Sequence, residues 1–397
     1  MNYRYQLAVE ITSHRARALG GYLLKGTFLT VYRQDFEISG TEDYDGIAEA
    51  IDIAVKESAG GDSSNRGPES VCVIIPSDQS CYRLGIREAD ISGIVTPETG
   101  KRCLQKFSGE AFEGGYALAC ITPISYTVDR SRTFPSFPLK VAGGELRMDA
   151  VLAYVPSEWF DGLKERLLRV GVSHLNYASS ATAAFRYISE CQGPSGLGLS
   201  DQFVLSLERE AGYILSSSSF ATDGRLVKPV PLYGGLDLLS ERISQRLAGV
   251  MSPEQVLDAL ETYGVKDSAH RPFPIAKDMS AKTFRQVASE ELEKLLSPAR
   301  GIASPTAIGN IVGEGGRIRG LDQILANVSQ RSSQVLGTSF YGATSPECSS
   351  LVGGILLLED TRWEREERRD REPTVVRTGR FPIAPRGQSG GGESDGR

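Results

Sequence analysis

Short apolar runs separated by tight turns open the chain. Residues 7–11, 17–24 and 28–32 are rich in β-branched, aromatic and small apolar side chains, and glycine pairs or Lys25-Gly26 interrupt them. This pattern predicts an antiparallel meander of three strands. Residues 43–57 then place Ile47, Ile51 and Ala54 at helical spacing, and a second apolar run follows at 70–75. The first unit is therefore three strands, a helix and a strand.

The same order of elements restarts after a Gly/Pro/Ser linker at 193–198. Apolar runs at 203–207, 213–220 and 226–232 repeat the meander, and the glycine pair Gly234-Gly235 opens a helix at 236–247. Further helices are predicted at 253–263 and 283–296, a strand at 306–312, and a closing apolar segment at 351–358. Two halves that open with the same meander predict a duplicated fold facing a central cleft.

Residues 83–157 interrupt the first half with a different pattern. A helix at 97–107, strands at 116–122 and 146–155, and a Pro/Phe-rich stretch at 133–138 indicate a small inserted α+β subdomain. A helix with Trp159, Leu163 and Leu167 on one face, a strand at 173–177 and a helix at 181–189 then return to the first unit.

Composition narrows the possible functions. The 397 residues carry a formal net charge of −6, which argues against general nucleic-acid binding. Six cysteines without a C-x-x-C pair and three histidines without metal spacing predict buried free thiols and no metal site. The N-terminus lacks a signal-peptide pattern and no apolar stretch is long enough to span a bilayer. We therefore expect a cytoplasmic protein.

Several local motifs, taken in order, resemble one known family. They are Ile121–Asp129 (ITPISYTVD), Ala178–Ala181 (ASSA), Gly234-Gly235 before a helix, Gly313–Gly316 (GEGG) and Val352–Gly354 (VGG). Over residues 5–358 the chain resembles FtsA, the bacterial actin homologue that links the FtsZ ring to the membrane in cell division. The sister PilM family of pilus-assembly proteins fits less well, because the segment Tyr126–Asp129 is FtsA-like.

The resemblance implies an α/β, duplicated actin-like (ribonuclease-H-like) fold around a central cleft, with an inserted small α+β subdomain, the SHS2 domain, in the first half. The expected first half comprises residues 1–82 and 158–192, with the insertion at 83–157. The expected second half comprises 199–236 and 303–360, with a helical partner-binding insertion at 237–302. Residues 361–397 form a charged tail that we expect to be disordered.

The nucleotide motifs of the family are degraded in this chain. In the first phosphate hairpin, Glu10 to Arg15, Thr12 replaces a glycine that allows close approach of phosphate. In the second hairpin, Ser206 replaces the metal-orienting aspartate, and Glu208, Arg209 and Glu210 replace three glycines. The adenosine-binding helix has leucines at 257 and 260 in place of a Glu and a Lys.

These changes predict a pseudo-ATPase with no catalytic residue and no cofactor, although weak ATP binding stays open. The residual nucleotide cleft would comprise Ser13, Gly234, Gly235, Gly313, Gly315 and Gly316. We expect Glu208 and Glu210 to form a solvated hairpin turn, and His14 to be an exposed loop residue.

The leading hypothesis is an FtsA-like division adaptor that binds an FtsZ-like filament protein. The resemblance places the docking of the FtsZ tail on the 237–302 subdomain, where the cations Lys277, Lys282 and Arg285 suit an acidic tail. Self-association through the inserted subdomain is a further possibility, with Asp129–Arg132, Phe134 and Phe137 as a docking loop or as a plain surface connection. The alternatives are a pilus or secretion assembly scaffold of the PilM kind, or an active actin-like ATPase.

The tail bears on membrane attachment and localisation. The charged run at 362–372 contains Trp363 as its single large apolar residue, and Pro373, Pro382 and Pro385 interrupt the residues after it. Such a tail has no apolar helical face to insert into a bilayer. We therefore expect the protein to reach the inner face of the cell membrane, at the division site, only through a partner.

Overall fold

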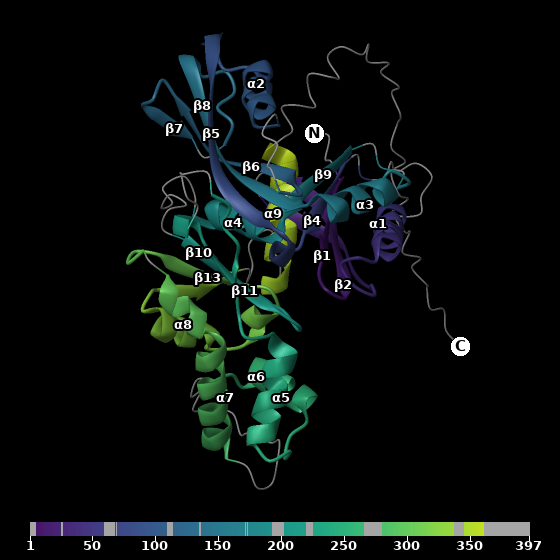
Figure 1. Ribbon diagram of the computed structural model, residues 1–397, viewed down its shortest axis with the longest axis vertical. Coiled ribbons are helices and arrows are strands. Elements are labelled where there is room, and N and C mark those ends of the chain that lie inside the picture. Colours follow the sequence, from purple (N-terminus) through teal and green to yellow (C-terminus); the bar gives the residue numbers. More distant parts are fainter. Residues whose placement is uncertain are drawn as a thin grey trace, which may run out of the picture.

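The computed structural model describes residues 5–24, 27–58, 68, 70–108, 114–134, 136–170, 172, 174–192, 202–219, 225–265, 280–302, 304–336 and 345–360. Two sheet-containing halves lie side by side across the middle of Figure 1, with a small sheet subdomain at the top and a helical lobe at the bottom. The tail at 361–397 and Lys277 lie outside the described residues.

The first half is a five-stranded sheet. Its strands are β1 (Tyr5–Ile11), β2 (Arg15–Leu24), β3 (Thr27–Glu37), β4 (Ser70–Ile75) and β9 (His174–Ser179), in the order β3-β2-β1-β4-β9. The three-strand meander is antiparallel, whereas β4 and β9 run parallel to β1. Every residue of β4 is buried, as expected for a parallel strand covered on both faces.

Helices cover both faces of this sheet. Alternate residues such as Leu7, Val9 and Val73 pack against α1 (Tyr44–Ser58) and α3 (Ser157–Leu167). The intervening residues, including Ala8 and Ile74, pack against α4 (Ser180–Gln192) and α9 (Ser349–Asp360). This two-residue alternation is the direct consequence of strand geometry.

The second half repeats the topology. Its sheet contains β10 (Gln202–Leu207), β11 (Gly212–Ser216), β12 (Val230–Pro231), β13 (Ile308–Val312) and β14 (Ser333–Val335), in the order β12-β11-β10-β13-β14. As in the first half, the second and first strands are antiparallel and the fourth is parallel to the first. The predicted duplication is therefore confirmed.

The third strand of this sheet is shorter than the predicted 226–232. Only Val230–Pro231 pair with β11, because Pro229 and Pro231 have no N–H to donate. Val227 instead exchanges two backbone hydrogen bonds of 2.8 Å with Tyr82, at the start of the inserted subdomain. This contact joins the second half to the insertion of the first.

The helical lobe of the second half contains α5 (Leu236–Arg246), α6 (Pro253–Thr262) and α7 (Ala281–Leu295). Ser252 and Gln255 form a capping box at the start of α6, with Pro253 at the first helical position. Leu257 and Leu260 are buried in the core of this half, as expected for a helix packed through its own apolar face. Helix α8 (Leu321–Ser329) packs between β13, β14 and α7.

The inserted subdomain is a four-stranded antiparallel sheet with one helix. Strands β5 (Cys81–Ile94), β6 (Tyr116–Val128), β7 (Arg132–Phe134) and β8 (Ala142–Pro156) lie in the order β5-β8-β6-β7. Helix α2 (Pro97–Ser108) covers one face through Cys103 and Phe107. The predicted small α+β insertion is present at the predicted place.

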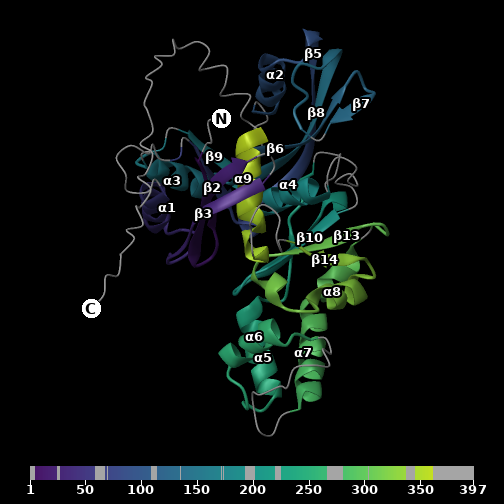
Figure 2. The same cartoon turned by 180° about the vertical axis from the view of Figure 1, so that it is seen from behind.

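One boundary predicted from the sequence is wrong. The sequence pattern assigns residues 303–360 to the second half, but α9 packs against α4, β1 and β4 of the first half. Gly353 permits this packing, since a Cβ there would lie 1.8 Å from the carbonyl oxygen of Ala183 in α4. Figure 2 shows α9 crossing beside α4 and the first sheet. The chain thus returns to the first half after completing the second.

Two further sequence predictions concern cysteines and membrane spans. Cys72, Cys81, Cys103, Cys120 and Cys348 are buried free thiols, whereas Cys191 is exposed. Among the described helices, none has the length and apolar character needed to cross a membrane.

Candidate functional site

The two meanders place their first hairpins opposite each other. In the β1–β2 turn, the backbone N–H and the hydroxyl of Thr12 both donate to the carbonyl of Arg15. In the β10–β11 turn, the N–H of Glu208 donates to the carbonyl of Ala211 at 2.9 Å. A cavity of about 690 Å³ lies between the hairpins. It is the candidate functional site of the chain.

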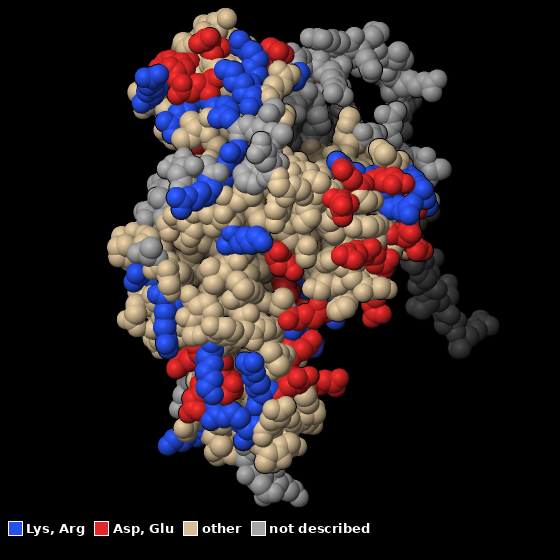
Figure 3. Space-filling view, viewed as in Figure 1, with Lys and Arg blue, Asp and Glu red and all other residues tan. Residues whose placement is uncertain are grey.

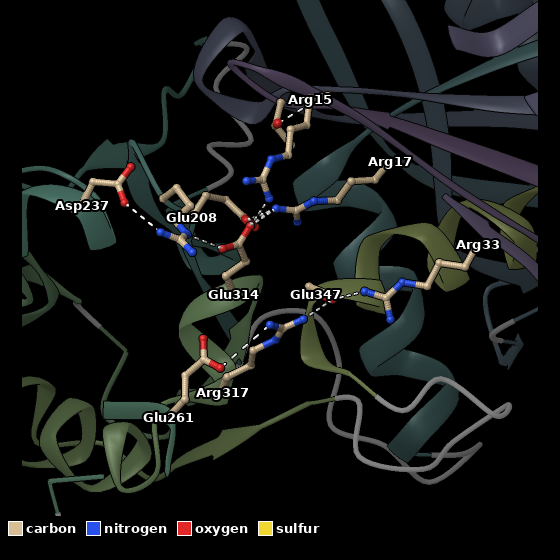
Figure 4. Close-up of polar contacts among 11 residues, drawn as sticks. Arg15, Arg17, Arg33, Glu208, Asp237, Glu261, Glu314, Arg317 and Glu347 are labelled. Atoms are coloured by element: carbon tan, nitrogen blue, oxygen red, sulfur yellow. Dashed lines mark hydrogen bonds and ion pairs between the residues drawn. The ribbon is translucent and has the colours of Figure 1, made fainter. Parts of the chain in front are cut away.

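Arg17 of β2 lies at the centre of the cleft wall. Its side chain is only 4% exposed and donates to Glu208 at 2.9 Å and, more closely, to Glu314. Both carboxylates belong to the second half, as Figure 4 shows. Burial opposes the charge of Arg17, but Glu208, Glu10 and Glu314 outweigh that effect and raise its pKa. Arg17 is therefore a permanent cation held between the two hairpins.

Glu314 is shared by three arginines. Besides Arg17, it pairs with Arg15 at 3.6 Å and with Arg209 at 3.2 Å. Arg209 also pairs with Asp237, at the start of α5, at 3.2 Å. Several hydrogen-bonded charges around one buried carboxylate compensate its desolvation better than a single pair could.

Two other carboxylates near Arg17 have perturbed pKa values. Glu10 of β1 is 5% exposed, and burial raises its pKa to about 7, with Arg17 opposing and Glu208 adding to the shift. Burial likewise raises the pKa of Glu208, again against the influence of Arg17. The Oε2 atom of Glu10 has no hydrogen-bond partner among the described residues, although it lines the cavity.

A second set of ion pairs between the two halves lies beside the pairs of Arg17. Arg33 of β3 pairs with Glu347, which precedes α9, and Glu347 also accepts from Arg317 at 2.5 Å. Burial disfavours the charge of Glu347, but Arg317 and Arg33 keep its pKa below the ordinary value. Figure 4 shows that Arg317 also pairs with Glu261 of α6. Charged pairs thus connect the two halves at two places.

The glycines predicted for the nucleotide cleft are used mainly in packing. Gly313 has φ = +79°, and a Cβ there would lie 2.2 Å from Oε1 of Glu208. Gly315 lies against Leu207, Gly316 against Pro346, and Gly235 against the backbone of Arg209. Of the six predicted residues, Ser13 and Gly234 line the cavity. The structure does not bring the six together as one binding surface.

Backbone donors at the start of α5 are also occupied. The N–H of Leu236 donates to the carbonyl of Glu208 at 2.9 Å, and the N–H of Asp237 donates to the carbonyl of Arg209 at 2.7 Å. A helix N-terminus can bind phosphate when such N–H groups are free. Here the second hairpin takes them instead.

The prediction of a solvated turn at Glu208 and Glu210 is wrong for Glu208. Its side chain faces a buried arginine that lies 191 positions away in the sequence, so local sequence could not reveal the pair. Glu210 is more open and lies 3.4 Å from His14, whose side chain is 61% exposed as predicted. Sequence reasoning missed Arg17 altogether, although an arginine inside an otherwise apolar strand is a usable signal for a buried ion pair.

Of the three predicted partner residues, Lys277 lies outside the described residues and the other two lie on α7. Lys282 is exposed near the start of α7, and Arg285 is half-buried on the same helix. In the inserted subdomain, Asp129 accepts from the N–H groups of Gly144 and Glu145, and Phe137 packs edge-to-face on Tyr126 at 5.5 Å. In the predicted docking loop, Asp129 and Phe137 therefore make their contacts within their own subdomain.

Comparisons with known proteins bear on the fold. A scan against models of known protein families finds no match, and a search of curated protein sequences finds none either. Solved structures do resemble the chain. A PilM–PilN type IV pilus biogenesis complex shares 13% identity, with 90% of this chain and 98% of that chain covered and a TM-score of 0.48.

Two further solved structures complete the comparison. MreB5 of Spiroplasma citri bound to ADP shares 11% identity over 92% of this chain and 98% of its own, with a TM-score of 0.48. Ethanolamine utilization protein EutJ from Carboxydothermus hydrogenoformans shares 10% identity over 90% of each chain, with a TM-score of 0.46. At these identities and TM-scores the similarity carries no argument about function, and the fold is read from the topology itself. With its duplicated five-stranded sheets around a cleft, the chain has the actin-like, ribonuclease-H-like fold.

Proposed function

We propose that this protein is a pseudo-ATPase adaptor, an actin-like protein that binds other proteins without using ATP. The observation that carries the proposal is the position of Arg17. Its guanidinium bonds to Glu208 and Glu314 between the two hairpins, where an actin-like protein would hold phosphates. The protein's own charges thereby meet between the hairpins, at the wall of the cavity.

Electrostatics supports this interpretation. A triphosphate would bring negative charge beside Glu10, Glu208 and Glu314, and like charges repel each other in a partly buried site. Displacing Glu208 or Glu314 from Arg17 would leave a buried charge uncompensated, which costs about 3–5 kcal/mol. The arginines present are already engaged with carboxylates, and the α5 amides with carbonyls.

One candidate partner is an FtsZ-like filament protein, docked through its acidic tail on the lobe of α5, α6 and α7. In Figure 3, Lys and Arg side chains gather on this lobe among acidic ones. Lys282 contributes an exposed cation at its surface. Such an adaptor would act at the division site on the inner face of the membrane, reaching the bilayer through a partner and self-associating through its inserted subdomain.

A pilus-assembly scaffold of the PilM kind is the second candidate. The preference for FtsA rests on the segment Tyr126–Asp129, yet Tyr126 and Val128 are buried in the subdomain core and Asp129 caps a turn. Structural requirements thus explain this segment without reference to a division partner. The segment therefore does not favour FtsA over PilM.

Calorimetry tests the pseudo-ATPase proposal. We expect purified protein titrated with Mg-ATP to show no binding in the micromolar range, and no ATP-dependent sedimentation. Micromolar binding or nucleotide-dependent filaments would instead favour an active actin-like ATPase. A synthetic FtsZ C-terminal peptide, titrated with and without Mg-ATP, separates the division adaptor from the pilus scaffold. Binding that is independent of nucleotide is the expected result for the division adaptor.

A further inference from the structure

Strand β3 forms one edge of the first sheet. It has 11 residues, and among the described strands it pairs with β2 alone. Within the described part of the chain, its outer row of backbone N–H and C=O groups is therefore open to pairing with a further strand. A bulge interrupts the pairing with β2 at Gly20 and Gly21, but residues 32–37 pair in unbroken register beyond it. The strand contains no proline and no lysine, the residues that commonly protect such an edge.

The exposed side chains of β3 divide it into an apolar end and an acidic end. Leu29 and Val31 are 51% and 53% exposed. Asp35 and Glu37 are exposed as well, and neither forms an ion pair with another residue that the structure describes. Arg33, between the two ends, is already paired with Glu347. An extended segment that matches this edge needs apolar side chains at one end and a cation at the other.

The tail beyond the described residues contains a segment with this composition. Residues 373–386 read PTVVRTGRFPIAPR and include three arginines and no acidic residue, whereas residues 362–372 mix both charges. Threonine, valine, isoleucine and phenylalanine, which favour strands, make up half of the segment. The segment is therefore suited to pairing with a partly apolar, partly acidic strand edge.

One antiparallel register matches the segment to β3 along its length. It has the following pairs: Arg377 with Asp35, Gly379 with Arg33, Phe381 with Val31, and Ile383 with Leu29. Opposite charges meet at one end, apolar side chains meet at the other, and a glycine faces the arginine that is already paired. Pairs of this kind are what stabilises neighbouring antiparallel strands.

Helix α9 places the start of the tail on this same sheet. It packs against β1, β2 and β4 and ends at Asp360, and β3 is the next strand beyond β2. Neighbouring strands lie about 4.8 Å apart. Residues 361–376 span up to about 50 Å when extended, which exceeds the length of β3. The segment therefore reaches either end of β3, and its covalent tether raises its effective concentration at this edge.

We propose that residues 374–383 of the tail bind in cis to the outer edge of β3 as an antiparallel strand. Main-chain hydrogen bonds along the edge supply the affinity, and the side-chain matches set the register. Pro382 then lies on the outermost strand of the sheet, where a missing N–H is tolerated. The bound tail covers the edge against pairing with a second copy of the chain. Neither ATP binding nor the identity of a protein partner enters this proposal.

Amide hydrogen exchange of the full chain tests the proposal. Residues 374–383 should exchange at least about tenfold more slowly than the same residues in a synthetic peptide of residues 373–386, because a paired amide is protected. The measurement is made at two protein concentrations, with sedimentation in parallel. Equal protection at both concentrations, in a monomer, supports binding in cis. Protection that appears only with a dimer, or exchange at the rate of the peptide, overturns the proposal.

A substitution in β3 locates the binding edge. Val31→Lys places a charge at the apolar end of the strand and should abolish the protection of residues 374–383. Val230→Lys is the matched control, because Val230 is 49% exposed on β12, the edge strand of the second sheet. The control should keep the protection of the full chain. If Val31→Lys keeps it too, the tail does not bind β3.

A substitution in the tail tests the charge match without altering a described residue. Arg377→Glu places a carboxylate opposite Asp35 and should speed the exchange of residues 374–383 about threefold, since like charges opposite each other destabilise a strand pair. Arg362→Glu, in the mixed-charge run before the segment, is the control and should leave the exchange unchanged. Thermal unfolding of each variant shows whether its fold is retained. Unchanged exchange in Arg377→Glu would contradict the proposed register.

Discussion

Arg17 and Glu208 are 191 positions apart in the sequence, and in the folded protein their side chains are joined by a hydrogen bond of 2.9 Å. Arg17 comes from the first half and Glu208 from the second, each beside the hairpin that opens its meander. Glu314 completes the contact from the glycine loop. The pair connects the two halves at the wall of the cavity between their hairpins.

Removing Arg17 should destabilise the protein strongly. Arg17→Met keeps much of the side-chain volume but removes the cation that pairs with Glu208 and Glu314, at a cost of about 3–5 kcal/mol. The free energy of unfolding, measured with urea, checks this. Arg15→Met is the matched control, because Arg15 is 42% exposed and its pair with Glu314 should contribute less than about 1 kcal/mol. Equal losses in the two variants would contradict the central role of Arg17.

The coupling between Arg17 and Glu208 can be measured directly. In a double-mutant cycle of Arg17→Met and Glu208→Gln, the double variant should be more stable than the sum of the single losses predicts. We expect a coupling of about 1–3 kcal/mol, since residues in one buried ion network are not additive. Additive losses would show that the contact does not hold the halves together.

Glu10 should give the protein a specific pH dependence. Its folded pKa of about 7 lies above that of an exposed glutamate, so the folded state binds the proton more tightly than the unfolded chain. The stabilising contribution is present at low pH and is lost as pH rises from about 4.5 through 7. Glu10→Gln should remove this loss.

The informative measurement is the difference in unfolding free energy between the wild-type protein and Glu10→Gln at pH 5, 6, 7 and 8. The difference should move in favour of the variant as pH rises, because the variant has no carboxylate to ionise in the buried site. In this difference, the contributions of carboxylates that do not interact with Glu10 cancel. If this difference did not change with pH, the pKa of Glu10 would not be raised in the folded protein.

Gly313→Ala should test whether the glycine loop packs on the second hairpin. An alanine at this position would have to adopt a positive φ, and its Cβ would lie 2.2 Å from Oε1 of Glu208. Gly249→Ala is the control, since it has a similar φ of +72° and nothing within 4 Å of the new methyl group. We expect about 1–2 kcal/mol of backbone strain in the control and a clearly larger loss at Gly313. Equal thermal shifts would argue against close packing there.

Gly353→Ala should test the return of α9 to the first half. A methyl group at this position would meet the backbone of α4, so the two helices would have to separate. Gly301→Ala, with open space around the new methyl group, is the control. The unfolding temperature should fall markedly only for Gly353→Ala. In that variant the rate of amide hydrogen exchange should rise in α4 and α9 together. Exchange confined to the second half would contradict the packing.

The sequence by itself determined the repeated part of this protein. Strand alternation, helical spacing and glycine-marked turns are local properties, so both meanders, the inserted subdomain and the burial of Leu257 and Leu260 could be predicted. The replacement of the family's glycines and aspartate by Glu208, Glu210 and Ser206 was also visible without coordinates.

Only the tertiary structure decided what those replacements do. Whether Glu208 faces water or an arginine depends on a contact across 191 residues, and whether α9 completes one half or the other depends on which apolar surface remains open. Spacing along the chain reports which residues share a face of one element. It does not report which face of a distant element they meet, because the folding of the whole chain brings the two together.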